Sequence, residues 1–92
     1  MSNVKATPEE LRKFAQNLRI MSGVLEENFS TLKRHGEHIN ETWGDNINRQ
    51  FMEKFSKQCQ DIFKIAESME EYSRFIDMKT GILEEYLRKG SL

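Results

Sequence analysis

The sequence predicts an all-α protein, an antiparallel two-helix hairpin that pairs as a dimer into a four-helix bundle. Two series of apolar residues repeat at alternating steps of three and four, which is the spacing of a helix that buries one stripe. A short break at residues 43–45 separates the two series, and the single proline stands ahead of both, at position 8. We therefore expect one domain over residues 1–92, with helices over 8–42 and 46–86 and a tail over 87–92.

Capping residues mark the start of the first helix. Thr7 suits the N-cap, Pro8 suits the first helical position, and Glu10 completes a capping box. The apolar series that follows consists of Leu11, Phe14, Leu18, Met21, Leu25, Leu32 and Ile39, with Asn28 and His35 in the two remaining places. This series predicts the stripe that faces the second helix.

The second helix carries an apolar series of the same period. Its members are Phe51, Phe55, Ile62, Ile65, Met69, Tyr72, Ile76, Leu83 and Tyr86, with Gln58 and Lys79 in the gaps. In the break, Gly44 can adopt the left-handed conformation that ends a helix, and Asp45 can cap the next one. So short a break between two such series predicts an antiparallel hairpin. Gly81 weakens the end of the second helix and either bends or terminates it.

Several large apolar residues lie outside both series and have nothing to cover them in a single hairpin. They are Val24, Phe29, Met52, Phe63, Phe75 and Ile82. Each forgoes roughly 1.5–3 kcal/mol of burial if it stays in water. Cys59, Ala66 and Ser73 are seven residues apart and small enough to let a partner helix come close. We therefore predict a dimer interface that includes Val24, Phe29, Met52, Cys59, Phe63, Ala66 and Phe75.

The composition argues against several classes of partner. Lys and Arg number 14 against 15 Asp and Glu, so neither nucleic acid nor an anionic membrane is expected as the main partner. No apolar run approaches the roughly 18–20 residues that cross a bilayer, so we expect no membrane insertion. Residues 1–7 have no positive region followed by an apolar stretch, which predicts that there is no cleaved signal peptide.

No set of residues predicts catalysis, so we expect a protein that is not an enzyme and holds no metal or cofactor. His35 and His38 are three residues apart, but no Glu-x-x-His step accompanies them, as a metal site in a helical bundle would require. Cys59 is the only cysteine, and neither a helix N-terminus nor a histidine at helical spacing activates it. A glycine-rich phosphate loop, a Ser/His/Asp set and a paired-carboxylate cleft are all missing from the sequence.

Trp43 invites a functional interpretation because it is the only tryptophan and falls at the hairpin tip. It can be a plug that packs on Ile39 or Ile47, or a recognition element that is presented to a partner. In a dimer the two roles are compatible, since the ring can pack on its own hairpin while its edge lines a groove against the partner.

These residues give the chain a resemblance to the WXG family, the small early-secreted-antigen-like proteins of type VII secretion systems. The resemblance covers nearly the whole chain: the opening residues 4–11 with their Thr-Pro-Glu-Glu cap, the tip motif Trp43, Gly44 and Asp45, and Phe51 eight residues after the tryptophan. It implies a dimeric four-helix bundle, a homodimer or a heterodimer with a sibling hairpin, that is exported folded from the bacterial cytoplasm. Such a protein acts as a secreted or cell-surface effector, or as an adaptor that carries one, and meets a secretion ATPase or a larger effector.

Two departures from the family pattern affect what the resemblance implies. The family tip is Trp-x-Gly, whereas here Gly44 follows Trp43 directly and Asp45 takes the glycine place. The family's tail signal is a tyrosine followed four residues later by an acidic residue, but Tyr86 is followed by Gly90. Leu83, Tyr86 and Leu87 are the candidates for a docking face on the tail. The chain would then travel on a partner's signal; the alternative is an intracellular helical adaptor or structural protein that is not exported.

Overall fold

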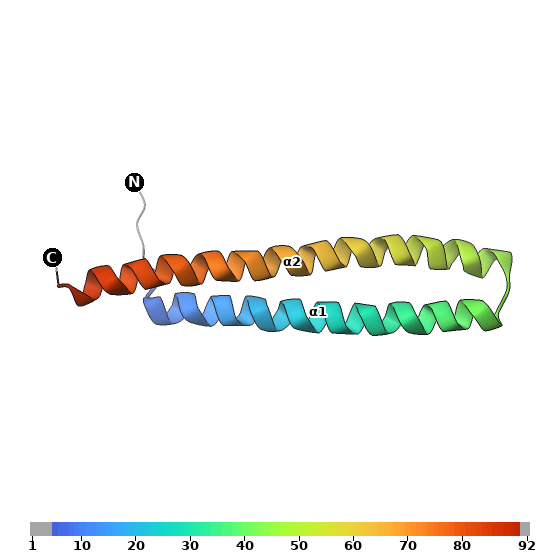
Figure 1. Cartoon of the computed structure of the whole chain (residues 1–92), viewed down its shortest axis with the longest axis horizontal. Coiled ribbons are helices and arrows are strands. Elements are labelled where there is room, and N and C mark those ends of the chain that lie inside the picture. The colour runs from blue at the N-terminus through green and yellow to red at the C-terminus, as the bar shows by residue number, and fades with distance from the viewer. Residues whose placement is uncertain (1–4, 91–92) are drawn as a thin grey trace.

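The computed structural model of this chain describes residues 5–90, which form two long helices joined by a tight turn. Helix α1 spans Pro8–Thr42 and helix α2 spans Asn46–Arg88. The two helices lie side by side and run antiparallel (Figure 1). The hairpin is elongated and measures 68 × 23 × 15 Å. The predicted helical hairpin is confirmed, and residues 5–90 contain no strand.

Both helices begin at the residues that the capping patterns predict. The Thr7 hydroxyl accepts a hydrogen bond from the backbone N–H of Glu10 at 3.1 Å, and Pro8 occupies the first turn. The Asp45 carboxylate accepts from the N–H groups of residues 47 and 48 at 2.7 and 3.2 Å. These bonds satisfy donors that a helix N-terminus otherwise leaves without partners. Because Asp45 caps α2 directly, the turn between the two helices consists of residues 43–45 alone.

The ends of the helices differ from the prediction in two respects. Gly44 is not left-handed, and the only positive φ in residues 5–90 belongs to Gly90, at 63°. Instead, α1 ends because Trp43 leaves the helical conformation at φ −114° and ψ 85°, while its N–H still donates to the Ile39 carbonyl at 2.8 Å. Gly81 does not terminate α2, which continues two residues past the predicted end at Tyr86.

Three contacts set the register of the hairpin. The Ser22 hydroxyl donates to the Ala66 carbonyl at 2.6 Å, and the Asn48 amide donates to the Asn40 side chain at 3.1 Å. A Cβ added at Gly36 would lie 2.9 Å from the Met52 sulfur, so these two residues also face each other. In each of these pairs the residue numbers add up to 88. The same register places Pro8 level with Thr80, so the last two turns of α2 extend past the start of α1.

The helices meet through small side chains rather than through the predicted apolar stripes. If each heptad is labelled so that Ala15 and Cys59 occupy position a, the fully buried residues fall at that position in both helices. They are Ala15 and Ser22 in α1, and Cys59, Ala66, Ser73 and Thr80 in α2. The predicted stripes lie at positions d and g. The d residues flank the contact, but Phe14 and Tyr72 at position g are 46% and 50% exposed.

Close packing at position a explains this rotation of the helices. Small residues allow two helix backbones to approach closely, and the hydroxyls among them need acceptors when they are buried. Ser22 finds its acceptor across the contact, whereas Ser73 and Thr80 donate to carbonyls in their own helix at 2.7 Å. Larger side chains at position g are therefore displaced to the surface of the hairpin.

The resulting core is small for a chain of 92 residues. Only Ala15, Cys59, Ala66 and Ile76 are buried hydrophobic residues within the part that the structure describes. The radius of gyration is 20.2 Å, compared with about 12 Å for a compact domain of this length. Two helices side by side have no second layer, so most of their apolar surface remains exposed.

Candidate association surface

The hairpin has two long sides of different chemistry. On one side, positions d and g of both helices carry mostly apolar residues, and position c adds four more at Val24, Ile47, Phe75 and Ile82. We call this side the apolar face. On the other side, positions b and e carry polar and charged residues, with half-buried Phe63 as the large apolar exception, and we call it the polar face. In an antiparallel pair the g positions of the two helices lie on the same side, as do the e positions. Contacts across the hairpin, described next, confirm both groupings.

Most of the exposed large hydrophobic residues belong to the apolar face. From α1 they are Phe14, Met21, Val24, Leu32 and Ile39, and from α2 they are Ile47, Phe51, Ile65, Tyr72, Phe75, Ile82 and Tyr86. The rings of Phe14 and Tyr72 meet edge to face with their centroids 5.8 Å apart, which joins the two helices on this side. No exposed large hydrophobic residue in the described chain lies at position b or e.

Two shallow hollows interrupt the apolar face, one near each end of the hairpin. The hollow at the open end has a volume of about 340 Å³ and is lined by Leu11, Tyr72, Phe75, Ile76, Lys79, Thr80 and Leu83. The hollow near the tip has a volume of about 300 Å³ and is lined by Leu32, His35, Gly36, Ile39, Asn48, Phe51, Met52 and Phe55. Between them, Asn28 and Gln58 occupy position g on the two helices and are exposed. The apolar face thus consists of two apolar segments with an amide layer between them.

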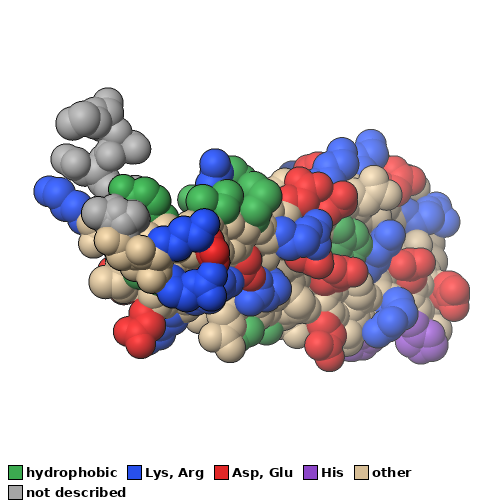
Figure 2. Space-filling model, turned by 60° about the vertical axis from the view of Figure 1, so that its left-hand side comes forward, with side chains coloured by type: hydrophobic (Ala, Val, Ile, Leu, Met, Phe, Trp, Pro, Cys, Tyr) green, Lys and Arg blue, Asp and Glu red, His purple; other side chains and the backbone are tan. Residues whose placement is uncertain are grey.

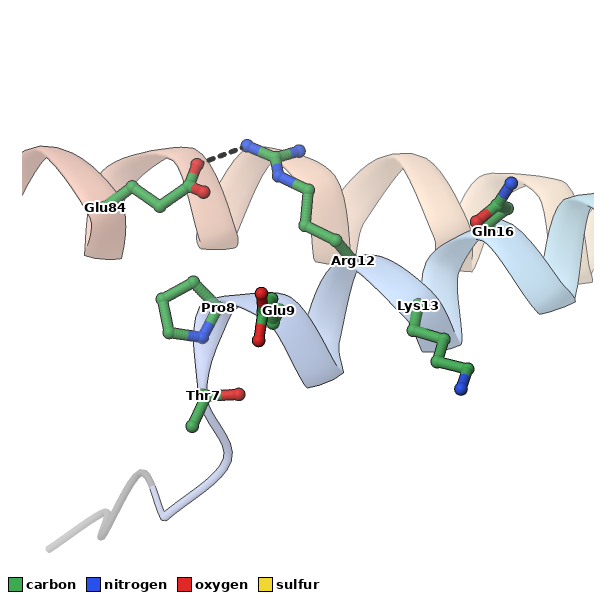
Figure 3. Close-up of a pocket in the computed structure, with 7 residues that line it drawn as sticks. All are labelled: Thr7, Pro8, Glu9, Arg12, Lys13, Gln16 and Glu84. Carbon is green, nitrogen blue, oxygen red and sulfur yellow. Dashed lines mark hydrogen bonds and ion pairs between the residues drawn. The ribbon is translucent and has the colours of Figure 1, made fainter.

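The polar face is held together by ion pairs between e positions. Arg12 pairs with Asp77 at 3.2 Å and with Glu84, and Arg19 pairs with Asp77 at 2.6 Å. The hydrogen bond from Arg12 to Glu84 raises the pKa of the Arg12 guanidinium further above its ordinary value. Figure 3 shows this bond at the open end, beside a shallow charged groove formed by the first turns of α1.

In the view of Figure 2, Lys and Arg side chains lie among Asp and Glu side chains, and hydrophobic side chains form only small patches. Exposed ion pairs of this kind contribute about 0–1 kcal/mol each, so they align the helices more than they stabilise them. A surface that is already ion-paired and hydrated gains little from association.

The predicted interface residues do not share one surface. Val24 and Phe75 lie on the apolar face, 43% and 50% exposed. Phe29, Met52 and Phe63 are half-buried, and Met52 faces α1 at Gly36. Cys59 and Ala66 differ most from the prediction, because both are fully buried between α1 and α2. Their small size brings the two helices of one hairpin together, so they cannot contact a partner.

Trp43 lies at the tip and is 57% exposed, so its own hairpin covers less than half of the residue. Ile47 and Phe51 beside it are 64% and 67% exposed. The tip motif therefore presents apolar side chains that its own hairpin leaves uncovered. Of the tail candidates, Leu83 is half-buried at the open-end hollow, whereas Tyr86 and Leu87 are 63% and 56% exposed. Val4, in the predicted opening motif, and residues 91–92 of the tail lie outside the described residues.

Other chemistry is sparse in the part of the chain that the structure describes. Residues 5–90 contain no group of three His, Cys, Asp or Glu side chains that are placed to hold a metal ion. Burial raises the pKa of the Cys59 thiol, so the side chain stays protonated at neutral pH. In neither helix does a stretch within residues 5–90 combine the length and apolarity needed to cross a membrane.

Sequence reasoning missed that Phe14, Phe51, Ile65 and Tyr72 belong to the outer surface. Their place in the apolar series predicts that they lie in the contact between the helices. The signal that identifies the contact is the series of small residues seven apart in both helices, which only Phe29 in α1 and Met52 in α2 interrupt. In that pattern, Ala15 and Ser22 match Ser73 and Ala66 across the hairpin.

Comparison with known proteins adds no family to this description. No family model, no curated protein and no solved structure matches the chain.

Proposed function

We propose that this protein is a non-catalytic association module, which acts by pairing its apolar face with that of another helical hairpin. The observation that carries the proposal is the contrast between the two sides of the hairpin. One side is polar and ion-paired, whereas the other exposes aromatic and branched side chains along nearly its whole length. Exposed apolar surface of this extent, bordered by polar residues, marks a protein interaction site.

The amount of exposed surface supports the same proposal. The chain exposes 7326 Å², roughly 1,700 Å² more than the area expected for a compact monomer of its mass. A stable protein–protein interface removes about 800 Å² from each partner. Pairing of the apolar face can therefore cover a standard interface and still leave the polar face in water.

A helical hairpin is the partner that fits this surface best. The apolar face runs the length of two helices, so a partner must be long and apolar along one side to cover it. Packing of one hairpin on another gives four helices around a shared core, which is an established way to bury one apolar stripe on each helix. A small globular partner would leave one of the two apolar segments exposed.

The first prediction is that the protein forms a dimer in solution. Light scattering at micromolar concentration should give twice the mass of a 10.9 kDa chain, because pairing removes the exposed apolar face from water. The midpoint of thermal unfolding should rise with protein concentration, since association stabilises the folded state by mass action. A monomer that stays folded, with the same midpoint over a hundredfold range of concentration, would refute self-association.

The resemblance to the WXG family supports a narrower proposal, that the paired hairpin is a substrate or adaptor of a type VII secretion system. It rests on the Thr7–Leu11 opening, the tryptophan tip and the length of the chain. Exposure of Trp43 is compatible with a recognition role at the tip. The alternative is a hairpin with the same association chemistry that works inside the cell as an adaptor or structural protein.

Fractionation of cultures of the source organism distinguishes these two roles. If the protein is a type VII substrate, we expect it in the culture supernatant or at the cell surface, and we expect it to disappear from both when the secretion ATPase is deleted. A cytoplasmic protein released by cell lysis serves as the control for leakage. Retention in the cytoplasm of intact cells that have an active secretion system would reject the secretion role and leave the association module unaffected.

A further inference from the structure

We infer that Met52 is a methionine oxidation site, and that conversion of its thioether to the sulfoxide opens the tip half of the hairpin. The inference concerns a contact between α1 and α2 of one chain, so it does not depend on the proposed association. The evidence comes from the fit of Met52 against Gly36, the hollows on either side of Met52, and the distribution of buried residues along the hairpin.

The thioether of Met52 occupies the space that a side chain at position 36 would need. A Cβ added at Gly36 would lie 2.9 Å from the Met52 sulfur and 3.2 Å from its methyl carbon. Both residues are half-buried at position a, so the thioether fills the gap between the two helix backbones. Met52 is the large member of this layer, and the missing side chain of Gly36 makes room for it.

Met52 can be reached from both sides of the hairpin. It lines the hollow near the tip on the apolar face. It also lines a hollow of about 340 Å³ on the polar side, together with Asn40, Arg49, Glu53, Ser56 and Lys57. Among the described residues, Met52 alone lines both of these hollows. A partner that covers the apolar face would therefore leave the second route open to a small oxidant.

The tip half of the hairpin has no buried core that could compensate for the loss of this contact. The buried residues lie within 15–22 and 59–80, and residues 23–58 contain none. In the segment 23–58, the contact between the helices consists of half-buried side chains, Met52 among them, and of the hydrogen bond from Asn48 to Asn40. A change at Met52 should therefore affect the tip half more than the open-end half.

Oxidation adds a polar atom at this contact. A hydroperoxide transfers its terminal oxygen to the sulfur: the O–O bond breaks, an S–O bond forms, and the sulfur gives up two electrons. The proton on the transferred oxygen moves to the departing oxygen, so hydrogen peroxide is reduced to water. The sulfoxide oxygen needs a hydrogen-bond donor, but the backbone N–H groups of α1 beside it already bond within the helix.

The sulfoxide therefore cannot keep the place of the thioether. Its oxygen cannot enter the contact with Gly36, where a Cβ would already be too close to the sulfur. If the side chain turns into one of the hollows instead, a gap remains beside Gly36 and the packing contacts of the thioether are lost. We expect the two helices to separate more often between this layer and the tip.

Two chains that differ in which helical methionine they retain test the inference. One retains Met52 and the other retains Met78, and leucine replaces the other methionines among Met21, Met52, Met69 and Met78. Leucine is close to methionine in volume, so both chains should fold. Met78 is 56% exposed at position f, away from both faces, so its oxidation should leave the contact unchanged.

Both chains are treated with hydrogen peroxide, and each is compared with its own untreated form. Mass spectrometry locates the added oxygen and follows amide hydrogen exchange. In the Met52 chain, we expect exchange over residues 30–55 to become faster by roughly tenfold or more, with a smaller change over 59–80. Its unfolding midpoint should fall by about 5 °C or more. Methionine sulfoxide reductases of both stereospecificities should restore the original values, and the Met78 chain should show no change.

Three results would overturn the inference. If Met52 stays unoxidised under conditions that oxidise Met78 fully, the hollows do not admit the oxidant. If Met52 is oxidised without faster exchange near the tip, the hairpin accommodates the sulfoxide. An equal change in both halves would indicate general unfolding rather than opening of the tip. Light scattering of the untreated chains reports pairing separately, so a monomer would refute the proposed function and leave the exchange comparison intact.

Discussion

Ile65→Glu is expected to abolish self-association at concentrations at which the unaltered chain is a dimer. Ile65 lies on the apolar face between the amide layer and the Phe14–Tyr72 pair, and its side chain is 51% exposed in a single hairpin. Pairing would bury two new carboxylates, one from each copy, without a cationic partner, and each costs several kcal/mol. Because 1.4 kcal/mol corresponds to a tenfold change, we expect the dissociation constant to rise by at least roughly 100-fold.

Ile20→Glu is the matched control. Ile20 is also an isoleucine within a long helix and is 55% exposed, but it lies at position f, away from both faces. The two substitutions make the same chemical change at sites of similar exposure, so they should differ only in the associated state. Sedimentation equilibrium of both variants measures the difference. Equal dissociation constants for the two variants would mean that the apolar face is not the interface.

Ala66→Leu should destabilise the hairpin itself. Ala66 is fully buried between the helices, and its carbonyl accepts the hydrogen bond from Ser22. A leucine adds three carbon atoms where the helices have no space, and overpacking of this kind costs about 1–3 kcal/mol. For a domain of this length, a loss of 2 kcal/mol corresponds to a decrease of roughly 10 °C in the unfolding midpoint.

Lys64→Leu provides the comparison, because position 64 is two residues away and exposed. Circular dichroism at one fixed protein concentration should show an unchanged midpoint for this variant and a lower one for Ala66→Leu. The outcome also distinguishes two roles for the small residues. If Ala66→Leu weakened dimerisation but left the midpoint of a dilute sample unchanged, the small residues would face a partner rather than α1.

The helices could be predicted from the sequence because the signals that define them are local. Thr7 and Asp45 accept hydrogen bonds from backbone N–H groups two or three positions away, and Pro8 fixes its own backbone dihedral. These effects do not depend on the rest of the fold. The shortness of the turn allows little slippage between the helices, so the antiparallel arrangement could also be predicted. The end of α1 was wrong in conformation, since Trp43 leaves the helix without help from a left-handed glycine, and α2 continues two residues past its predicted end.

The rotation of each helix about its axis could not be predicted in the same way. Positions a, d and g form one continuous stripe, and either a with d or d with g can form the contact. Phe14, Ile65 and Tyr72 contribute more apolar area, which favoured the second choice. The structure adopts the first because Ala15 and Ala66 allow a closer approach, and this advantage depends on how both helices match. The choice of contact positions also decides which residues form the apolar face. The sequence therefore identifies these residues as apolar but does not show that they lie on the outer surface.

The small core of the single hairpin has a consequence for how much of this protein a cell can keep. Four buried hydrophobic side chains and a few exposed ion pairs leave an unpaired chain marginally stable, so it should open often and be accessible to proteases. Pairing would protect the chain, and the degree of protection would increase with concentration. Copies made in excess of their partners would then be degraded first, so turnover would match the amount of the protein to the number of pairs that form.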